Sequence, residues 1–279
     1  PLDRRFHAQP NACPVCGPQL SWHDVDGRPL AGDPLTEAAA ALASGAVVAI
    51  KRLGGSHLAV DAGSAAAVER LRVRKHRPGK PLAVMVADLA AAERLCRVSP
   101  AEAELLTSIE HPIVLLDRQP VADLAPEVAP GLGILGVMLA YTPLHHLLLA
   151  EPLAPAVLVM TSGNLSDEPI CTGNDEALDR LRGLADFFLL HNREIVTRVD
   201  DSVARVMGGR PRLLRRARGY SPVPILLRQP TRDILACGAE MKNSFCLVRR
   251  GEAYLSQHIG ELTGPERLDF YQESITHLQ

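Results

Sequence analysis

Short, continuous apolar runs alternate with helix-like segments through the middle of the chain. The apolar runs are typical of buried strands and lie at 46–50, 57–61, 82–86, 112–116, 156–160 and 187–190. Helix starts are predicted at Asp33-Pro34, at Ser64, and at Ser99-Pro100-Ala101-Glu102, which has the spacing of a capping box. The alternation of helices with buried strands predicts an α/β sheet covered by helices.

The pattern changes after residue 195. Residues 195–216 contain two strand-like runs around Gly208-Gly209, which predicts a hairpin and therefore a mixed sheet. The next segment, Tyr220–Arg232, contains three prolines and has the composition of a linker. Further strands are predicted at 234–236, 244–249 and 253–259, and a helix at 265–279. These last elements are typical of the beginning of another domain.

Residues 1–30 are polar and irregular, and they include too few apolar side chains to form a core of their own. We therefore divide the chain into a first segment at 1–30, a main domain at 31–220, a linker at 221–233 and the start of a further domain at 234–279. The sequence begins at Pro1 and its last helical pattern lacks a stop signal, so we expect a fragment of a longer polypeptide.

Composition and charge narrow the class of protein. The chain of 279 residues is 47% hydrophobic and 22% charged, which is typical of a globular protein. Its formal net charge is −2, so there is no global attraction to nucleic acid or membranes, and any basic site must be local. No apolar run reaches the roughly 18 residues of a membrane helix, and the six cysteines are too scattered for a disulfide framework. We expect a soluble, cytoplasmic protein.

The stretch VRKHRPGKPLAVMV, residues 73–86, concentrates positive charge directly in front of a predicted buried strand. Lys75, Arg77 and Lys80 lie close together in it. Two prolines stiffen the turn, and Gly79 allows a ligand to approach the backbone. Like charges held close together favour a bound anion, whereas a solvated surface loop is the alternative interpretation.

Two further stretches have the chemistry of a phosphate site. At Thr161-Ser162-Gly163-Asn164 an apolar strand runs into hydroxyl, glycine and amide groups, which can hold phosphate or ribose oxygens. The run 212–219 adds four arginines. An ordinary turn and an exposed hairpin edge are the respective alternatives. Together with the basic stretch, these residues predict one site for a polyanion such as a triphosphate.

The pairing of Lys75-x-Arg77 and Lys80-Pro81 with Ser162-x-Asn164 resembles the KxR and SxN signature of YrdC-like domains, which bind ATP and form carbamoyl-type adenylates. Other stretches resemble the HypF family of carbamoyltransferases in [NiFe]-hydrogenase maturation. They are Arg4–Pro18, Lys51–Leu58, Tyr141–His146, His191–Arg193, Asp200–Ser202 and Gly238–Asn243.

The resemblance implies a fold and a reaction. The fold would be a YrdC-like twisted mixed sheet with covering helices, preceded by the C-terminal part of a zinc-finger domain and followed by the start of a TsaD-like domain. Carbamate derived from carbamoyl phosphate would be adenylated by ATP with release of pyrophosphate. The carbamoyl group would then pass to the C-terminal cysteine of the partner protein HypE.

The resemblance also implies roles for individual residues. The catalytic cations would be Lys75, Arg77 and Lys80. The nucleotide would be held by Thr161, Ser162, Asn164, His191, Arg215 and Arg218. The carbamate pocket would be bounded by Lys51, Gly54, Gly55 and His57. Adenylate formation depends on positioning and charge neutralisation more than on acid–base chemistry, in agreement with this choice of residues.

Two metal sites are predicted. Cys13-Pro-Val-Cys16 offers two of the four ligands of a tetrahedral zinc site, with His7 a weaker third, and an unliganded pair in a turn is the alternative. Asp201, next to Asp200, offers a carboxylate for Mg²⁺ that bridges ATP oxygens, and an exposed acidic turn is the alternative. We therefore expect ATP, Mg²⁺ and Zn²⁺ as cofactors.

Two other functions remain open. A threonylcarbamoyl-adenylate synthase of tRNA modification has the same KxR and SxN signature, although the CxxC pair and Gly238–Asn243 argue against it. A non-enzymatic RNA-binding module could use the same basic surface, although only 4% of the residues are aromatic and available for base stacking. We expect His145 and His146 to pack in the core or at an interface, and we assign no role to His258.

Overall fold

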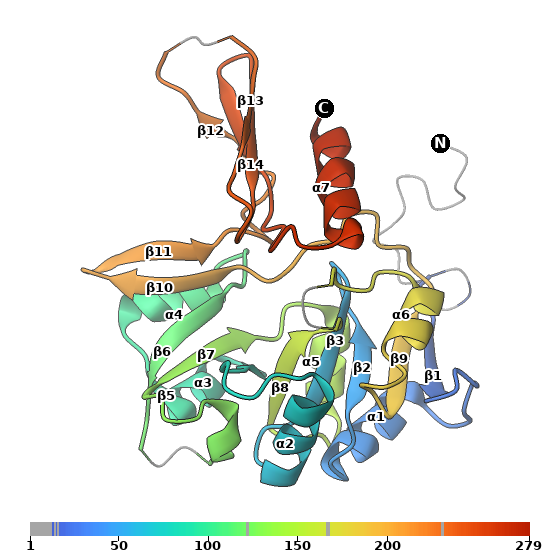
Figure 1. Ribbon diagram of the computed structural model, residues 1–279. Helices are drawn as coiled ribbons and strands as arrows, with labels where there is room; N and C mark the ends of the chain where they lie inside the picture. Colours follow the sequence, from blue (N-terminus) through green and yellow to red (C-terminus); the bar gives the residue numbers. More distant parts are fainter. Residues whose placement is uncertain (1–12, 14, 16, 121–122, 166–167, 230–231) are drawn as a thin grey trace.

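The computed structural model describes residues 13, 15, 17–120, 123–165, 168–229 and 232–279. Figure 1 shows a large sheet with its helices, and above it a smaller sheet together with the last helix. The helices are α1 (Pro34–Ala43), α2 (Ala65–Arg74), α3 (Leu89–Leu95), α4 (Pro100–Thr107), α5 (Pro143–Ala150), α6 (Asn174–Arg180) and α7 (Pro265–Leu278).

Among the described residues, eleven strands form the larger sheet, in the order β1-β9-β2-β3-β8-β4-β7-β6-β10-β11, with β5 paired to β6. They are β1 (Leu20–Asp24), β2 (Val48–Lys51), β3 (Ser56–Asp61), β4 (Ala83–Val86), β5 (Cys96–Arg97), β6 (Ile113–Arg118), β7 (Ile134–Leu139), β8 (Val157–Ser162), β9 (Phe187–His191), β10 (Val203–Met207) and β11 (Arg210–Arg215). The pairs β2/β9, β4/β7 and β6/β10 are parallel, and the others are antiparallel. The predicted mixed sheet is confirmed.

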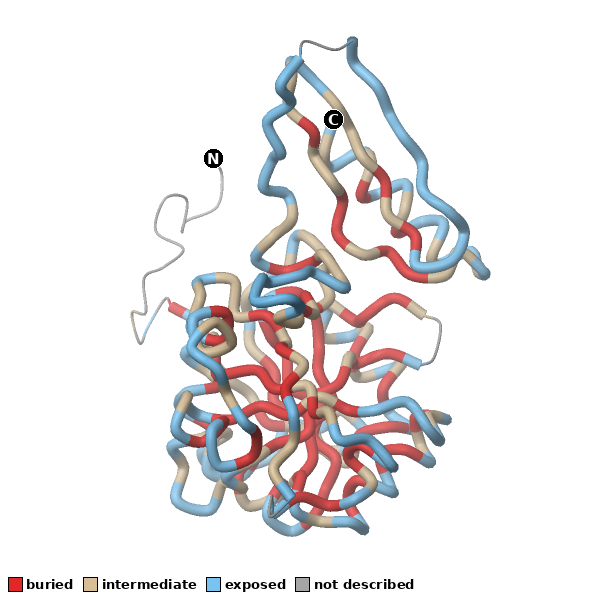
Figure 2. Tube along the Cα trace, turned by 90° about the vertical axis from the view of Figure 1, so that its left-hand side faces the viewer, coloured by how far each residue is buried: buried red, intermediate tan, exposed pale blue. Residues whose placement is uncertain are grey.

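Both faces of the central part of this sheet are buried, which explains why its central strands have continuous apolar sequences. Helices α2, α3, α4 and α6 cover one face, and α1 and α5 cover the other. In β4, Val84 and Val86 belong to the core on the first face, while Met85 belongs to the core on the second. Figure 2 shows that buried residues are concentrated in this part of the molecule.

The helix starts follow from local hydrogen bonding. At α1 the Asp33 carboxylate accepts from the backbone N–H groups of Leu35 and Thr36. At α4 the Glu102 carboxylate accepts from the backbone N–H of Ser99 at 2.8 Å, as the capping-box spacing predicts. An acceptor of this kind stabilises a helix by about 1 kcal/mol.

The smaller sheet has the strand order β12-β15-β14-β13. Its strands are β12 (Ile225–Leu226), β13 (Ile234–Cys237), β14 (Phe245–Arg249) and β15 (Glu252–Leu255). Helix α7 packs against it where the rings of Phe245 and Tyr271 meet edge to face, 5.6 Å apart. All residues of β12 and β13 are exposed, in contrast to central strands of the larger sheet such as β2 and β3 (Figure 2).

Two segments that were expected to be irregular contain strands. Strand β1 lies within 1–30 and pairs with β9, and there Trp22 stacks on Phe187 with ring centroids 5.0 Å apart. Strand β12 lies within the predicted linker 221–233 and pairs with β15. Strand β1 contains only two apolar residues, Leu20 and Trp22, and β12 is only two residues long, so neither gives a recognisable apolar run, and both are held by backbone pairing to a neighbouring strand.

Candidate functional site

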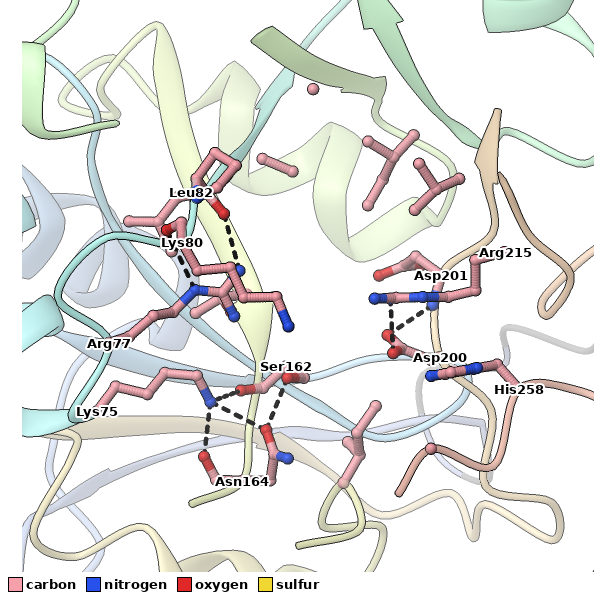
Figure 3. A pocket seen from close by; sticks show the side chains of 18 of the residues that line it. Lys75, Arg77, Lys80, Leu82, Ser162, Asn164, Asp200, Asp201, Arg215 and His258 are labelled. Carbon is pink, nitrogen blue, oxygen red and sulfur yellow. Dashed lines mark hydrogen bonds and ion pairs between the residues drawn. The ribbon is translucent and has the colours of Figure 1, made fainter. Parts of the chain in front are cut away.

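A cavity of about 820 Å³ lies between the larger sheet and residues 258–270. Three stretches far apart in the sequence meet in it, as Figure 3 shows. They are the basic loop (residues 75–82), the end of β8 with Asn164, and the segment 198–203 that leads into β10. The predicted convergence of the basic stretch with the Thr161–Asn164 turn is therefore present in the structure.

One part of the cavity wall is apolar. Ala83, Leu115 and Gly136 line it from three adjacent strands, and Gly136 is the register partner of both of the others. A Cβ atom on Gly136 would lie 3.1 Å from Cγ2 of Ile113 and 3.5 Å from Cβ of Ala83. Because residue 136 has no side chain, these strands leave an apolar slot that a planar ring can enter.

Lys75 connects the two signature motifs. Its side chain is almost fully buried, and Nζ donates to the backbone oxygens of Ser162 and Asn164 at 2.7 and 2.6 Å and to Asn164 Oδ1 at 2.9 Å. Burial, with a contribution from the charge of Arg77, lowers the pKa of Lys75 to about 7. Lys75 therefore positions the Ser162–Asn164 turn and can change its charge near neutral pH.

The basic loop is held in shape by Arg72, a residue that the sequence did not single out. Its Nη1 donates to the backbone oxygens of Arg77, Pro78 and Lys80 at 2.8, 3.3 and 3.1 Å. Arg77 in turn donates through Nη2 to the oxygen of Pro81 at 2.8 Å, and burial, together with Arg72 and Arg215, lowers its pKa to about 10. Hydrogen bonds from Arg72 and Arg77 to backbone carbonyl groups of the basic loop thus fix the shape of the loop that carries Arg77 and Lys80.

The opposite wall carries Arg215, Asp200 and His258 (Figure 3). Arg215 Nη1 donates to Asp200 Oδ2 at 2.7 Å. His258 comes from the segment after the smaller sheet, and burial, with Arg215 contributing, lowers its pKa to about 4. The sequence offered no reason to place His258 here, because its neighbours in the cavity are distant along the chain.

Two residues expected to hold the nucleotide lie outside the cavity lining. Arg218 is buried beneath it, with its guanidinium 3.6 Å from the centre of the Tyr141 ring and its Nη atoms donating to the backbone oxygens of Glu110 and His111. His191 lies at the end of β9, where burial lowers its pKa to about 4, with Lys51 contributing. Neither side chain lines the cavity.

The residues expected to bound a carbamate pocket do not form one wall of the cavity. Lys51 lines a separate pocket of about 350 Å³, and its Nζ donates to Asn174 Oδ1 at 2.7 Å. A Cβ atom on Gly54 would lie 2.3 Å from Val199 Cγ1, and one on Gly55 would lie 2.4 Å from Ile170 Cγ2. The two glycines therefore allow close packing of the loop on its neighbours.

Asp201 lines the cavity, but its carboxylate is engaged in a buried charge network, and the Mg²⁺ role expected of it stays a prediction. The residue is 3% exposed, and its carboxylate pairs with His57 at 2.8 Å, Arg218 at 3.0 Å and Arg52 at 3.5 Å. Burial alone would raise the pKa of Asp201, but Arg52 and His57 outweigh it and hold the pKa well below its ordinary value. His57, assigned to the carbamate pocket, is thus part of a buried charge network.

Of the two histidines after Tyr141, only His145 packs in the core as expected. His145 is 1% exposed and its ring meets the Tyr141 ring edge-on at 4.6 Å, while His146 is exposed. Burial lowers the pKa of His145 well below its ordinary value, with His57 contributing. A neutral, buried imidazole at this position fills the core.

The zinc prediction falls mainly outside the described residues. Cys13 is described and partly buried, whereas Cys16 and His7 lie outside the described residues. Within the part of the chain that the structure describes, no three His, Cys, Asp or Glu side chains gather in a way that could hold a metal ion. In the same part, none of the helices has the length and apolar character needed to cross a membrane.

Three family models match the chain, one after another. The HypF finger matches residues 1–23, the Sua5/YciO/YrdC family, described as telomere recombination, matches 40–217, and the HypF Kae1-like domain matches 229–279. The second match spans more than half of the sequence. The chain belongs to the Sua5/YciO/YrdC family. Its mixed sheet is a YrdC-like fold, with a finger segment before it and a Kae1-like segment after it.

Carbamoyltransferases of the HypF type are similar to nearly the whole chain. Carbamoyltransferase HypF of Rhodobacter capsulatus is 50% identical over 265 residues, which cover 94% of this chain and 35% of the relative. Probable carbamoyltransferase HypF of Methanocaldococcus jannaschii is 38% identical, over 88% of this chain and 32% of the relative. The chain thus spans about a third of the length of the curated relatives it matches.

Solved structures agree with this relationship. A full-length HypF in a phosphate- and nucleotide-bound form is 47% identical and has a TM-score of 0.92, over 99% of this chain and 36% of that one. Sua5 of P. abyssi complexed with L-threonine is 23% identical, with a TM-score of 0.58 over 67% of this chain and 56% of that one. The second likeness shows the fold alone, whereas the predicted resemblance to HypF is confirmed.

Proposed function

We propose that this chain carries out the step in which carbamate and ATP form carbamoyl adenylate and pyrophosphate, in the maturation of [NiFe] hydrogenases. The observation that carries the proposal is the cavity in which the basic loop meets Ser162 and Asn164 through Lys75. Relatives named carbamoyltransferase HypF support the reaction class, and the nucleotide-bound form of HypF supports ATP as the ligand.

The two halves of the cavity fit the two halves of ATP. The apolar slot at Gly136 would take the adenine ring, while the basic loop and Arg215 would face the phosphates. Ser162 and Asn164, positioned by Lys75, would hold phosphate or ribose oxygens. The cavity volume of about 820 Å³ is sufficient for a nucleotide together with a small second substrate.

The proposed reaction needs charge stabilisation more than proton transfer. A carbamate oxygen attacks the α-phosphorus of ATP, the bond from this phosphorus to the bridging oxygen breaks, and pyrophosphate leaves with the electron pair. Negative charge therefore grows on the leaving group. Arg77 and Lys80 on one wall and Arg215 on the other are placed to stabilise it, and such preorganised charges favour the transition state over the ground state.

The proposal extends to the wider pathway and its cofactors. We propose that the carbamate comes from carbamoyl phosphate, that HypE receives the carbamoyl group on its C-terminal cysteine, and that the reaction takes place in the cytoplasm. The four-part division at 1–30, 31–220, 221–233 and 234–279, with zinc bound to the first part, belongs to the same proposal. Mg²⁺ that accompanies ATP, with Asp201 of the cavity wall as a candidate ligand, is part of the same proposal.

The proposal is tested by measuring AMP and pyrophosphate formation from ATP with two sets of substrates. Ammonium carbamate is supplied directly in one reaction, and threonine plus bicarbonate in the other. We expect turnover with carbamate alone. Turnover only with threonine would instead assign the chain to the synthesis of threonylcarbamoyl adenylate, and RNA binding with a steep salt dependence but no turnover would favour the RNA-binding alternative.

A further inference from the structure

The side of the cavity across from the basic loop is closed by residues that follow the smaller sheet. His258, Glu261, Arg267 and Phe270 all line it. The basic loop and the Ser162–Asn164 turn precede that sheet in the sequence. A ligand in the cavity would therefore contact two parts of the chain that have the whole smaller sheet between them.

This closing segment is anchored to the part of the chain that carries the larger sheet. The backbone N–H of His258 donates to the oxygen of Arg216 at 2.9 Å. Further along, Arg267 Nη2 donates to the oxygen of Glu168 at 2.8 Å. The segment that carries His258 is thus fixed at two points, at the backbone of His258 itself and at the side chain of Arg267.

We propose that the His258 imidazole binds the phosphate groups of the nucleotide, so that the segment after the smaller sheet completes the ATP site. This inference rests on the proposed function. His258 lies beside Arg215 and Asp200 and across the cavity from Lys80, as Figure 3 shows. The carboxylate of Asp200 is already paired with Arg215 at 2.7 Å, and an imidazole N–H is a donor for a phosphate oxygen.

The charges around His258 favour an anion next to it. Lys80, Arg215 and Arg267 contribute positive charge there and Asp200 contributes negative charge, while the carboxylates of Asp201 and Glu261 also line the cavity. Burial lowers the pKa of His258 to about 4, with Arg215 contributing, so the free imidazole is neutral near neutral pH. A bound phosphate would stabilise the imidazolium and raise this pKa, and ATP binding would then take up a proton from solvent.

Calorimetric titration of the full 279-residue chain with ATP and with adenosine tests the inference. We expect His258→Asn to weaken ATP binding about tenfold or more, the usual effect of losing one charge-assisted hydrogen bond, and to leave adenosine binding unchanged. The matched control is His277→Asn. His277 also reaches the larger part of the molecule, through Thr197 Oγ1 at 3.3 Å, but it does not line the cavity, so both affinities should stay as in the wild type.

Titration with ATP at about pH 5.5, in two buffers of different ionisation enthalpy, measures the number of protons taken up on binding. This number would not depend on His258 if the residue only packed in the wall. The wild type should take up more protons than His258→Asn, whereas Lys75, with a pKa of about 7, is already charged at this pH. Unchanged ATP affinity and proton uptake in His258→Asn, or equal losses for ATP and adenosine, would overturn the role of His258. A wild-type chain that binds no ATP would instead overturn the proposed function.

Discussion

At the scale of single residues, Lys75 is the centre of the site. It is buried, it bonds to the backbone of the Ser162–Asn164 turn, and it lies next to Arg77 in the basic loop. The same ammonium group therefore organises the turn and adds charge to the cavity. A substitution at Lys75 is expected to affect the binding of phosphate through both effects.

Replacing Lys75 or Arg77 by Ala should weaken ATP binding by about 10- to 100-fold each, because a charge-assisted contact is lost in a partly buried site. Arg250→Ala is the control, since Arg250 lies in the exposed turn between β14 and β15. Fluorescence or calorimetric titration measures all three. Small and equal effects in the three variants would mean that the basic loop is merely solvated.

The pKa of about 7 for Lys75 predicts a pH dependence. An anion stabilises the charged ammonium and raises its pKa in the complex, so the contribution of Lys75 to ATP affinity is complete below about pH 7 and decreases as the pH rises above it. The ATP affinities of wild type and Lys75→Met are measured at each pH and expressed as a ratio. The protonation of ATP itself affects both proteins equally and cancels in this ratio. A ratio that stays constant from about pH 6 to 9 would contradict the shifted pKa.

The residues of the site could be predicted only in part from the sequence. Lys75, Ser162 and Asn164 belong to recognisable motifs, and the structure brings them together. Arg218 lies in an arginine-rich run, but the sequence does not show which way a side chain points. In the structure the Arg218 side chain lies in the buried charge network around Asp201.

At the scale of elements, the apolar slot depends on three adjacent strands, β4, β7 and β6. Gly136 in β7 is opposite Ala83 of β4 and Leu115 of β6, so one missing side chain opens the surface of all three. The sequence did not predict β7, because the glycines around it weaken a strand pattern. Its pairing with two buried apolar strands outweighs this weakness.

Gly136→Val should fill the slot and weaken ATP binding about tenfold or more, while inorganic pyrophosphate, which has no ring, should bind as before. Gly133→Val is the matched control, because no atom lies within 4 Å of a Cβ placed at Gly133. Competition binding with both ligands measures the difference. An equal loss of ATP and pyrophosphate affinity in Gly136→Val would place the adenine ring elsewhere.

At the scale of the whole molecule, the cavity lies where two parts of the chain meet, and neither part contains all of its walls. The α/β class and most strands of the larger sheet could be predicted, because buried strands have continuous apolar sequences. The contacts between the two parts could not be predicted from the sequence, because they include isolated polar contacts such as the hydrogen bond from the backbone of His258 to that of Arg216. Such contacts leave no periodic pattern in the sequence.

The central claim is that this cavity forms an adenylate of carbamate. The most direct test is exchange of labelled pyrophosphate into ATP, because exchange requires reversible formation of the adenylate at the site. We predict exchange by the wild type that depends on added carbamate, that is retained in Arg250→Ala and that is lost in Lys75→Ala. Wild-type protein that binds ATP but shows no carbamate-dependent exchange, or a Lys75→Ala variant that exchanges at the wild-type rate, would contradict the claim.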